Sequence, residues 1–84
     1  MPDDIGRVVE RWRQLPLDRA AAAFPLVRAA LHELAVAARG PDISVPDLGL
    51  AAVADQLRVL ADDVSRANPA YPLAERLTQL RRRL

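Results

Sequence analysis

The sequence predicts an all-α protein: a small antiparallel bundle of four helices, or of five if the second helix breaks at Pro25. Three observations support this fold class. Apolar residues recur every three or four positions in four separate segments, which is the spacing of one face of an α-helix. Proline or glycine stands between neighbouring segments. The chain has 84 residues, so we expect a single domain over residues 1–84 with a modest core.

Composition excludes several classes of protein. There is no cysteine, so disulfides and thiolate metal sites are excluded. All 12 basic residues are arginine, and together with the abundant alanine this is typical of a high-GC bacterial genome. Residues 1–14 are too charged for a signal peptide, and no run approaches the ~18 apolar residues of a membrane span. We therefore expect a soluble cytoplasmic protein without a membrane partner.

The first predicted helix begins at Asp3 or Asp4, because a carboxylate there accepts hydrogen bonds from free backbone N–H groups. Pro16 ends it, since proline disfavours helical geometry at the residue before it. Trp12 is expected as a core anchor rather than as a ligand-stacking group. The apolar face comprises Ile5, Val8, Val9, Trp12 and Leu15.

The second predicted helix runs from Leu17 or Asp18 to Arg39, and Pro25 interrupts it. Proline removes one backbone donor and crowds the carbonyl of Ala21, so we expect either a kink or a new helix starting at Pro25. The main apolar stripe comprises Ala20, Phe24, Val27, Leu31, Leu34 and Ala38. A second apolar flank comprises Leu26, Ala29, Val36 and Ala37. A helix this broadly apolar is expected to be covered on more than one side.

Gly40 and Pro41 close the second helix, with glycine just past the last turn and proline beyond it. The connection that follows, Asp42–Pro46, is short, so we expect the second and third helices to form a long antiparallel hairpin. The sequence allows two ways of capping the third helix. Either Ser44 and Asp47 form a capping box, or Asp47 is itself the N-cap residue.

The third predicted helix spans Asp47–Ala67 and is two-sided. Its apolar stripe comprises Leu50, Val53, Leu57, Leu60, Val64 and Ala67. Its outer face carries Asp55, Arg58, Asp62 and Arg66, with unlike charges one turn apart. Asn68-Pro69 ends this helix, and Pro72 starts a fourth. The fourth helix has an all-leucine seam of Leu73, Leu77, Leu80 and Leu84.

Charge is unevenly distributed although the net charge is only +1. Residues 41–67 hold two arginines and five aspartates, whereas residues 68–84 hold four arginines and one glutamate. If the fourth helix folds back on the third, Arg76 comes near Asp63 and Arg83 near Asp55. The basic end is then neutralised inside the fold. This use is favoured over a nucleic-acid contact by Arg76, Arg81, Arg82 and Arg83, because consecutive arginines fan around a helix.

No set of residues predicts a catalytic or metal site. His32 is the only histidine and cannot form a structural metal site alone. Asp62 and Asp63 are adjacent on a helix and point about 100° apart, so surface charge is their expected role. Ser44 lacks the Asp-Ser-Leu motif of a carrier-protein attachment serine. We therefore expect no enzyme activity, no cofactor and no metal.

Two function classes remain. The first is a non-catalytic helical module that associates with a partner protein or with itself, with a homodimer favoured. The candidate association face comprises Leu26, Val36, Leu80 and Leu84. The second is a small nucleic-acid-associated regulator that uses the C-terminal arginines with Arg7 and Arg11 of the first helix. Salt-sensitive binding to arbitrary duplex DNA would distinguish the second class from the first.

Overall fold

The computed structural model describes residues 4–84 and shows a four-helix bundle, so the predicted all-α fold class is confirmed. The helices over this range are α1 (Asp4–Gln14), α2 (Leu17–Arg39), α3 (Val53–Ala67) and α4 (Leu73–Arg83), with a 3-10 turn, η1 (Leu50–Ala52), leading into α3. No strand occurs in the part of the chain that the structure describes. A cap at Asp3 lies outside that part.

Pro25 does not break the second helix. α2 is a single helix of 23 residues with Pro25 inside it, so the bundle has four helices over residues 4–84 rather than five. Pro16 precedes its first residue, and Gly40 follows its last with φ 96°, a conformation that favours glycine. The Gly40 N–H donates to the carbonyl of Val36 at 2.9 Å, which closes the helix as predicted.

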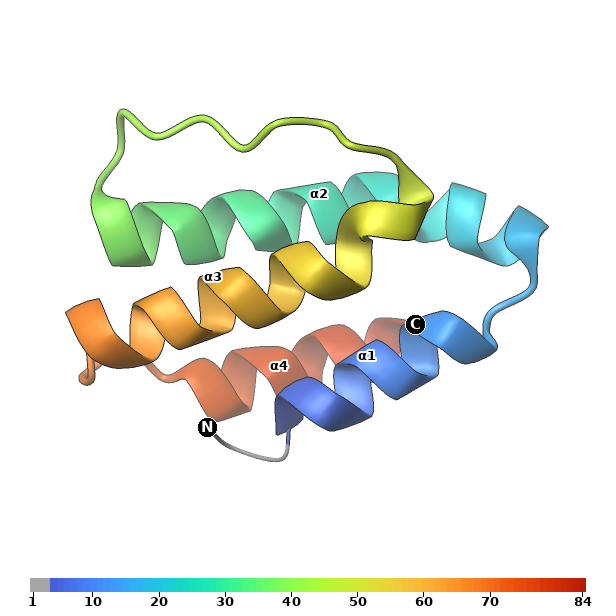
Figure 1. Ribbon diagram of the computed structural model, residues 1–84. Coiled ribbons are helices and arrows are strands. Elements are labelled where there is room, and N and C mark those ends of the chain that lie inside the picture. Colours follow the sequence, from blue (N-terminus) through green and yellow to red (C-terminus); the bar gives the residue numbers. More distant parts are fainter. Residues whose placement is uncertain (1–3) are drawn as a thin grey trace.

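The prediction of an antiparallel hairpin is wrong, because α2 and α3 run in the same direction (Figure 1). The side-chain amide of Asn68, just after α3, donates to the carbonyl of Ala37 near the end of α2 at 3.3 Å. Arg39 and Asp63 also pair near the ends of these helices. The connection is therefore not a short turn. Residues 40–49 run back along α2, and ten extended residues reach up to about 33 Å, close to the ~35 Å length of a 23-residue helix.

α1 and α4 also run parallel to each other, and together they lie antiparallel to α2 and α3 (Figure 1). The hydroxyl of Thr78 donates to the carboxylate of Asp4 at 3.2 Å. Further along the same pair, the guanidinium of Arg11 donates to the carbonyl of Leu84 at 3.0 Å. The bundle thus consists of two parallel pairs, and the ends of α1 and α4 lie side by side.

The third helix starts later than predicted. Regular α3 begins at Val53, after η1, whereas Asp47 was expected as its start or cap. The carboxylate of Asp47 instead accepts the N–H of Gly49 at 3.0 Å, and Gly49 has φ 84°. This local turn uses the side chain that a cap would need, so neither the capping box with Ser44 nor a cap at Asp47 forms.

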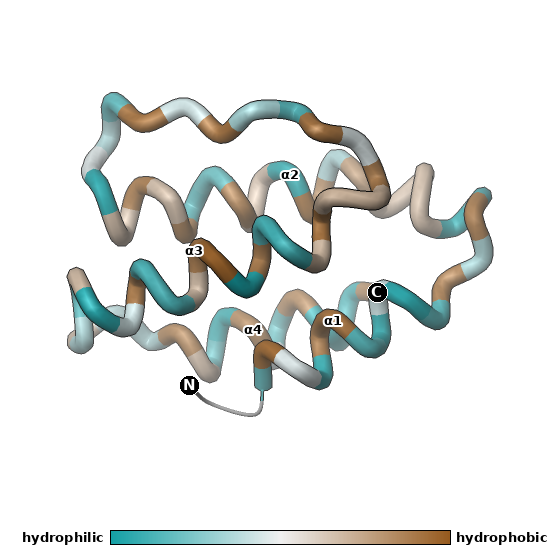
Figure 2. Tube along the Cα trace, in the orientation of Figure 1, coloured by the Kyte–Doolittle hydropathy of each residue, from teal (hydrophilic) through white to brown (hydrophobic). Residues whose placement is uncertain are grey.

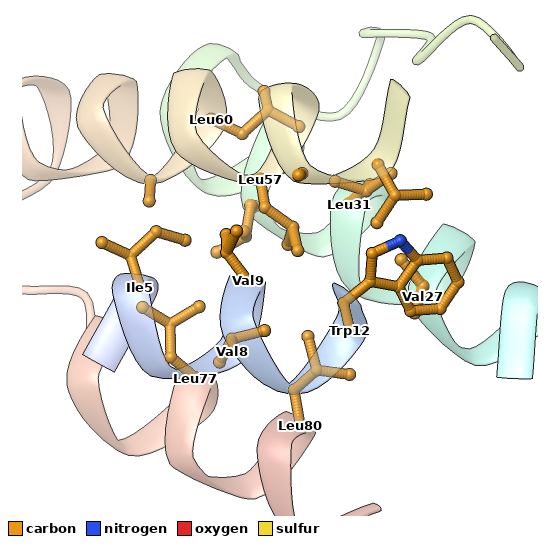
Figure 3. Close-up of a cluster of buried hydrophobic side chains, with 14 of the residues drawn as sticks. Ile5, Val8, Val9, Trp12, Val27, Leu31, Leu57, Leu60, Leu77 and Leu80 are labelled. Carbon is orange, nitrogen blue, oxygen red and sulfur yellow. The ribbon is translucent and has the colours of Figure 1, made fainter. Parts of the chain in front are cut away.

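The predicted apolar stripes form one core (Figure 3). Every buried residue described by the structure is apolar. Leu57 of α3, Leu31 of α2 and Val8 of α1 are completely buried, and Leu77 of α4 is 1% exposed. Trp12 is 7% exposed and packs in the same core, as expected for an anchor. Packing of these stripes, rather than helix propensity, holds the short helices in place.

By length and composition, α2 also meets the requirement for a membrane span, since an 18-residue window in it has a mean hydropathy of 1.3. The expectation that no segment approaches a span therefore does not hold for this helix. The core helix of a soluble bundle meets the same requirement, so one such helix is weak evidence for a membrane span. In the structure 28% of the window is buried, and Val27 lies fully inside the core.

Candidate functional site

The residues considered for chemistry lie apart from one another. His32 is exposed on α2. Asp62 pairs with Arg66 at 3.2 Å, and Asp63 pairs with Arg39. Over residues 4–84, no group of three or more His, Cys, Asp or Glu side chains is placed to hold a metal ion. The described part of the chain therefore offers surfaces, rather than a constellation of reactive groups.

The first surface is built by the strap, which is the name used here for residues 40–49. Three hydrogen bonds fasten it to both long helices. The guanidinium of Arg28 on α2 donates to the carbonyls of Val45 at 2.7 Å and Pro46 at 2.9 Å. The side-chain amide of Gln56 on α3 donates to the same Pro46 carbonyl at 2.9 Å. The strap is thus held in one position although it has no regular secondary structure of its own.

The strap encloses one side of an apolar hollow of about 260 Å³. Its lining residues come from the strap, α2 and α3, and are Ala35, Arg39, Ile43, Ser44, Val45, Pro46, Leu48, Asp55, Gln56, Val59 and Leu60. Apolar positions are interspersed along the strap itself (Figure 2). Leu48 is 62% exposed and Val59 is 56% exposed. We name Ile43, Val45, Leu48 and Val59 the strap surface.

The predicted association face is divided in the structure. Leu80 and Leu84 are only 7% and 8% exposed, so they belong to the core of the chain itself and are unavailable to a partner. Leu26 is half-buried and lines, with Leu80, a second hollow of about 240 Å³ between α2 and α4. Val36 is half-buried on α2 and does not line that hollow. These four residues therefore do not form one surface.

A polar cluster lies at the edge of the hollow between α2 and α4. The hydroxyl of Tyr71 donates to the carboxylate of Glu33 at 2.6 Å, and the guanidinium of Arg76 lies 3.3 Å from the same oxygen. Burial, followed by the hydrogen bond and the negative charge of Glu33, raises the pKa of Tyr71 to about 12. The cluster links α4 to α2 and places Arg76 away from Asp63.

The expected neutralisation of the basic helix by the acidic one is therefore wrong. Arg76 pairs with Glu33 of α2, and Asp63 pairs with Arg39. Arg83 lines the hollow between α2 and α4, whereas Asp55 lies beside the strap. The physical reason is topology: α4 packs mainly along α1, which carries several arginines itself.

The second surface lies between α1 and α4. Arg7 and Arg11 of α1 line an open hollow of about 640 Å³ together with Arg81 and Arg82 of α4. We name these four residues the arginine hollow. Gly6, Glu10 and Gln14 complete its lining. Over residues 4–84, none of the four arginines forms an ion pair with a carboxylate. The structure thus brings Arg81 and Arg82 together with the two arginines of α1. Arg76 and Arg83 lie elsewhere and line the hollow between α2 and α4.

Comparison of the chain with protein-family models, with curated proteins and with solved structures finds no match. Its function is therefore argued from the two surfaces.

Sequence reasoning did not identify the strap surface. Two signals for it are present in the sequence. Ile43, Val45 and Leu48 are apolar positions between polar ones, and Asp47-Leu48-Gly49 is a turn sequence that leaves its central leucine outside a helix. Helical periodicity assigned Leu48 to the first turn of the third helix, so its exposed position outside a helix was not predicted.

Proposed function

We propose that this protein is a non-catalytic helical module that acts by binding another protein through the strap surface. The observation that supports this proposal is that Leu48 and Val59, two large apolar side chains more than half exposed, line the same apolar hollow. Isolated exposed apolar residues are common on soluble proteins, but apolar side chains gathered around a hollow mark a site of association.

The strap surface also has the preorganisation that binding favours. Its backbone is already fixed by Arg28 and Gln56, so a partner does not have to order it. Arg39 and Asp55 are charged residues among its otherwise mainly apolar lining, and they provide polar contacts beside the apolar side chains. Burying a side chain such as Leu48 or Val59 contributes about 1.5–3 kcal/mol.

The partner that we expect first is a second copy of the chain. A chain of 84 residues removes only about 60% of its unfolded surface from water, so a dimer that covers the strap surface would add stability. In a twofold dimer the same patch meets itself, and Leu48 of one protomer would contact the apolar hollow of the other.

Leu48→Glu tests the proposal, with Leu17→Glu as the matched control. Both leucines are exposed, at 62% and 75%, but Leu17 does not line the strap hollow. We expect sedimentation equilibrium to show a dimer for the native protein and for Leu17→Glu, and a shift to monomer for Leu48→Glu with unchanged helical circular dichroism. A native protein that stays monomeric at the highest attainable concentration, or equal effects of the two substitutions, would contradict self-association through this surface.

A further inference from the structure

The parallel arrangement of α1 and α4 gathers basic residues from two distant parts of the sequence. Arg11 and Arg13 lie in the last turn of α1, and Arg81, Arg82 and Arg83 lie in the last turn of α4. These two helix ends are side by side (Figure 1), and Arg11 contacts the carbonyl of Leu84 directly. The basic last turn of α1 is therefore packed against the basic last turn of α4.

Stabilisation of helix ends accounts for only part of this charge. A helix C-terminus carries about −0.5 of an elementary charge, so two adjacent ends carry about −1. The arginine hollow holds four arginines against the single carboxylate of Glu10, which leaves three positive charges in excess. About two of those charges are not offset by the helix ends. This excess predicts an anionic partner.

The polarity of the lining indicates which kind of anion. All residues that line the hollow are arginine, glutamine, glutamate or glycine, with no apolar side chain among them. Protein interfaces and membrane-binding helices need an apolar centre, whereas interfaces with nucleic acid are polar and positively charged. Arginine and glutamine side chains are common donors to phosphate and sugar oxygens.

The position of the aromatic side chains indicates whether the nucleic acid is single-stranded or double-stranded. Proteins that hold single strands stack the bases on accessible aromatic rings. Trp12, the aromatic residue of α1, is 7% exposed and packs in the core. The arginine hollow thus offers charge without a stacking platform, which suits a double-stranded backbone.

We propose that the arginine hollow binds the phosphodiester backbone of duplex nucleic acid without reading its sequence. Arg7 lies one helical turn before Arg11 on α1, and Arg81 and Arg82 add two guanidinium groups from α4. The guanidinium of Arg11 holds the carbonyl of Leu84 and so joins the two helices beside the hollow. Glu10 lies in the same lining and limits the affinity by repulsion. The site is separate from the strap surface and does not depend on it.

Salt dependence of binding to a duplex DNA of arbitrary sequence tests the proposal. If Arg7, Arg81 and Arg82 each neutralise one phosphate while Arg11 stays bonded to Leu84, the logarithm of the binding constant falls with the logarithm of salt with a slope of about −2.7. Arg7→Gln with Arg82→Gln should weaken binding and make the slope about two units shallower. Arg19→Gln with Arg58→Gln is the matched control, because it removes the same charge at residues outside the hollow and should leave the slope unchanged.

A second pair of variants changes the hollow without removing an arginine. A Cβ at Gly6 would meet no atom within 4 Å, so larger side chains fit there. Gly6→Glu adds a negative charge to the hollow and should abolish binding, whereas Gly6→Gln, nearly equal in shape, should retain it. No retention on duplex DNA at low salt, equal losses in the two arginine pairs, or binding to vesicles of anionic lipid in place of DNA would each overturn the proposal.

Discussion

Gly6 and Gly49 lie in different backbone conformations, so the same substitution should have opposite effects at the two positions. Gly6 is inside α1, where alanine is a better helix former and where an added Cβ meets nothing. Gly49 has φ 84°, and L-residues rarely adopt that conformation. Each glycine therefore has a separate physical role, one replaceable and one required by the turn at Asp47.

We expect Gly6→Ala to raise the free energy of unfolding by about 0.5–1 kcal/mol, because alanine reduces the entropy of the unfolded chain. Gly49→Ala should lower it by about 1–2 kcal/mol through backbone strain. Urea denaturation followed by circular dichroism measures both values. Equal changes in the two variants would show that the turn at Gly49 does not depend on its positive φ.

At the scale of elements, the apolar stripes could be predicted from the sequence and the path between them could not. The seams of α1, α3 and α4 follow helical periodicity, which is local, and most of their residues are buried as expected. Leu15 and Leu50 are only partly buried, and Ala67 is exposed. The direction of α3 depends on the path of residues 40–49 back along α2, and its contacts with Arg28 join residues 17 and 18 positions apart. The arginine hollow depends on that direction too, because it requires α1 and α4 to lie side by side.

The strap should loosen when Arg28 is replaced. Arg28→Met retains an apolar side-chain stem but removes both hydrogen bonds to the strap. Because the donor is charged, we expect the free energy that holds the strap in place to fall by about 1–3 kcal/mol. We expect thermolysin to cleave residues 43–48 faster in this variant while helical circular dichroism is unchanged. Arg58→Met is the control, since Arg58 is exposed on α3 and does not line the strap hollow. Unchanged cleavage in Arg28→Met would mean that apolar contacts of Ile43 and Val45 hold the strap without the arginine.

At the scale of the whole molecule, the parallel pairing of helices determines which residues can meet. It separates the acidic α3 from the basic α4 over most of their lengths and places α4 along α1. An antiparallel hairpin of α2 and α3 would instead place the end of α3 beside the start of α2. Both proposed surfaces would then be built from other residues, so the topology itself can be tested independently of any ligand.

Engineered cysteines distinguish the two topologies, because the native chain has no cysteine to interfere. The side-chain amide of Asn68 contacts the carbonyl of Ala37, so Ala37→Cys with Asn68→Cys should join readily with a short bis-maleimide. Ala21→Cys with Asn68→Cys should not join, since Ala21 is exposed near the start of α2, and an antiparallel hairpin predicts the reverse. Denaturing electrophoresis detects the joined chain by its faster migration, and spectra of both variants should match the native helical signal. Joining of the second pair in preference to the first would remove the topology on which the arginine hollow depends.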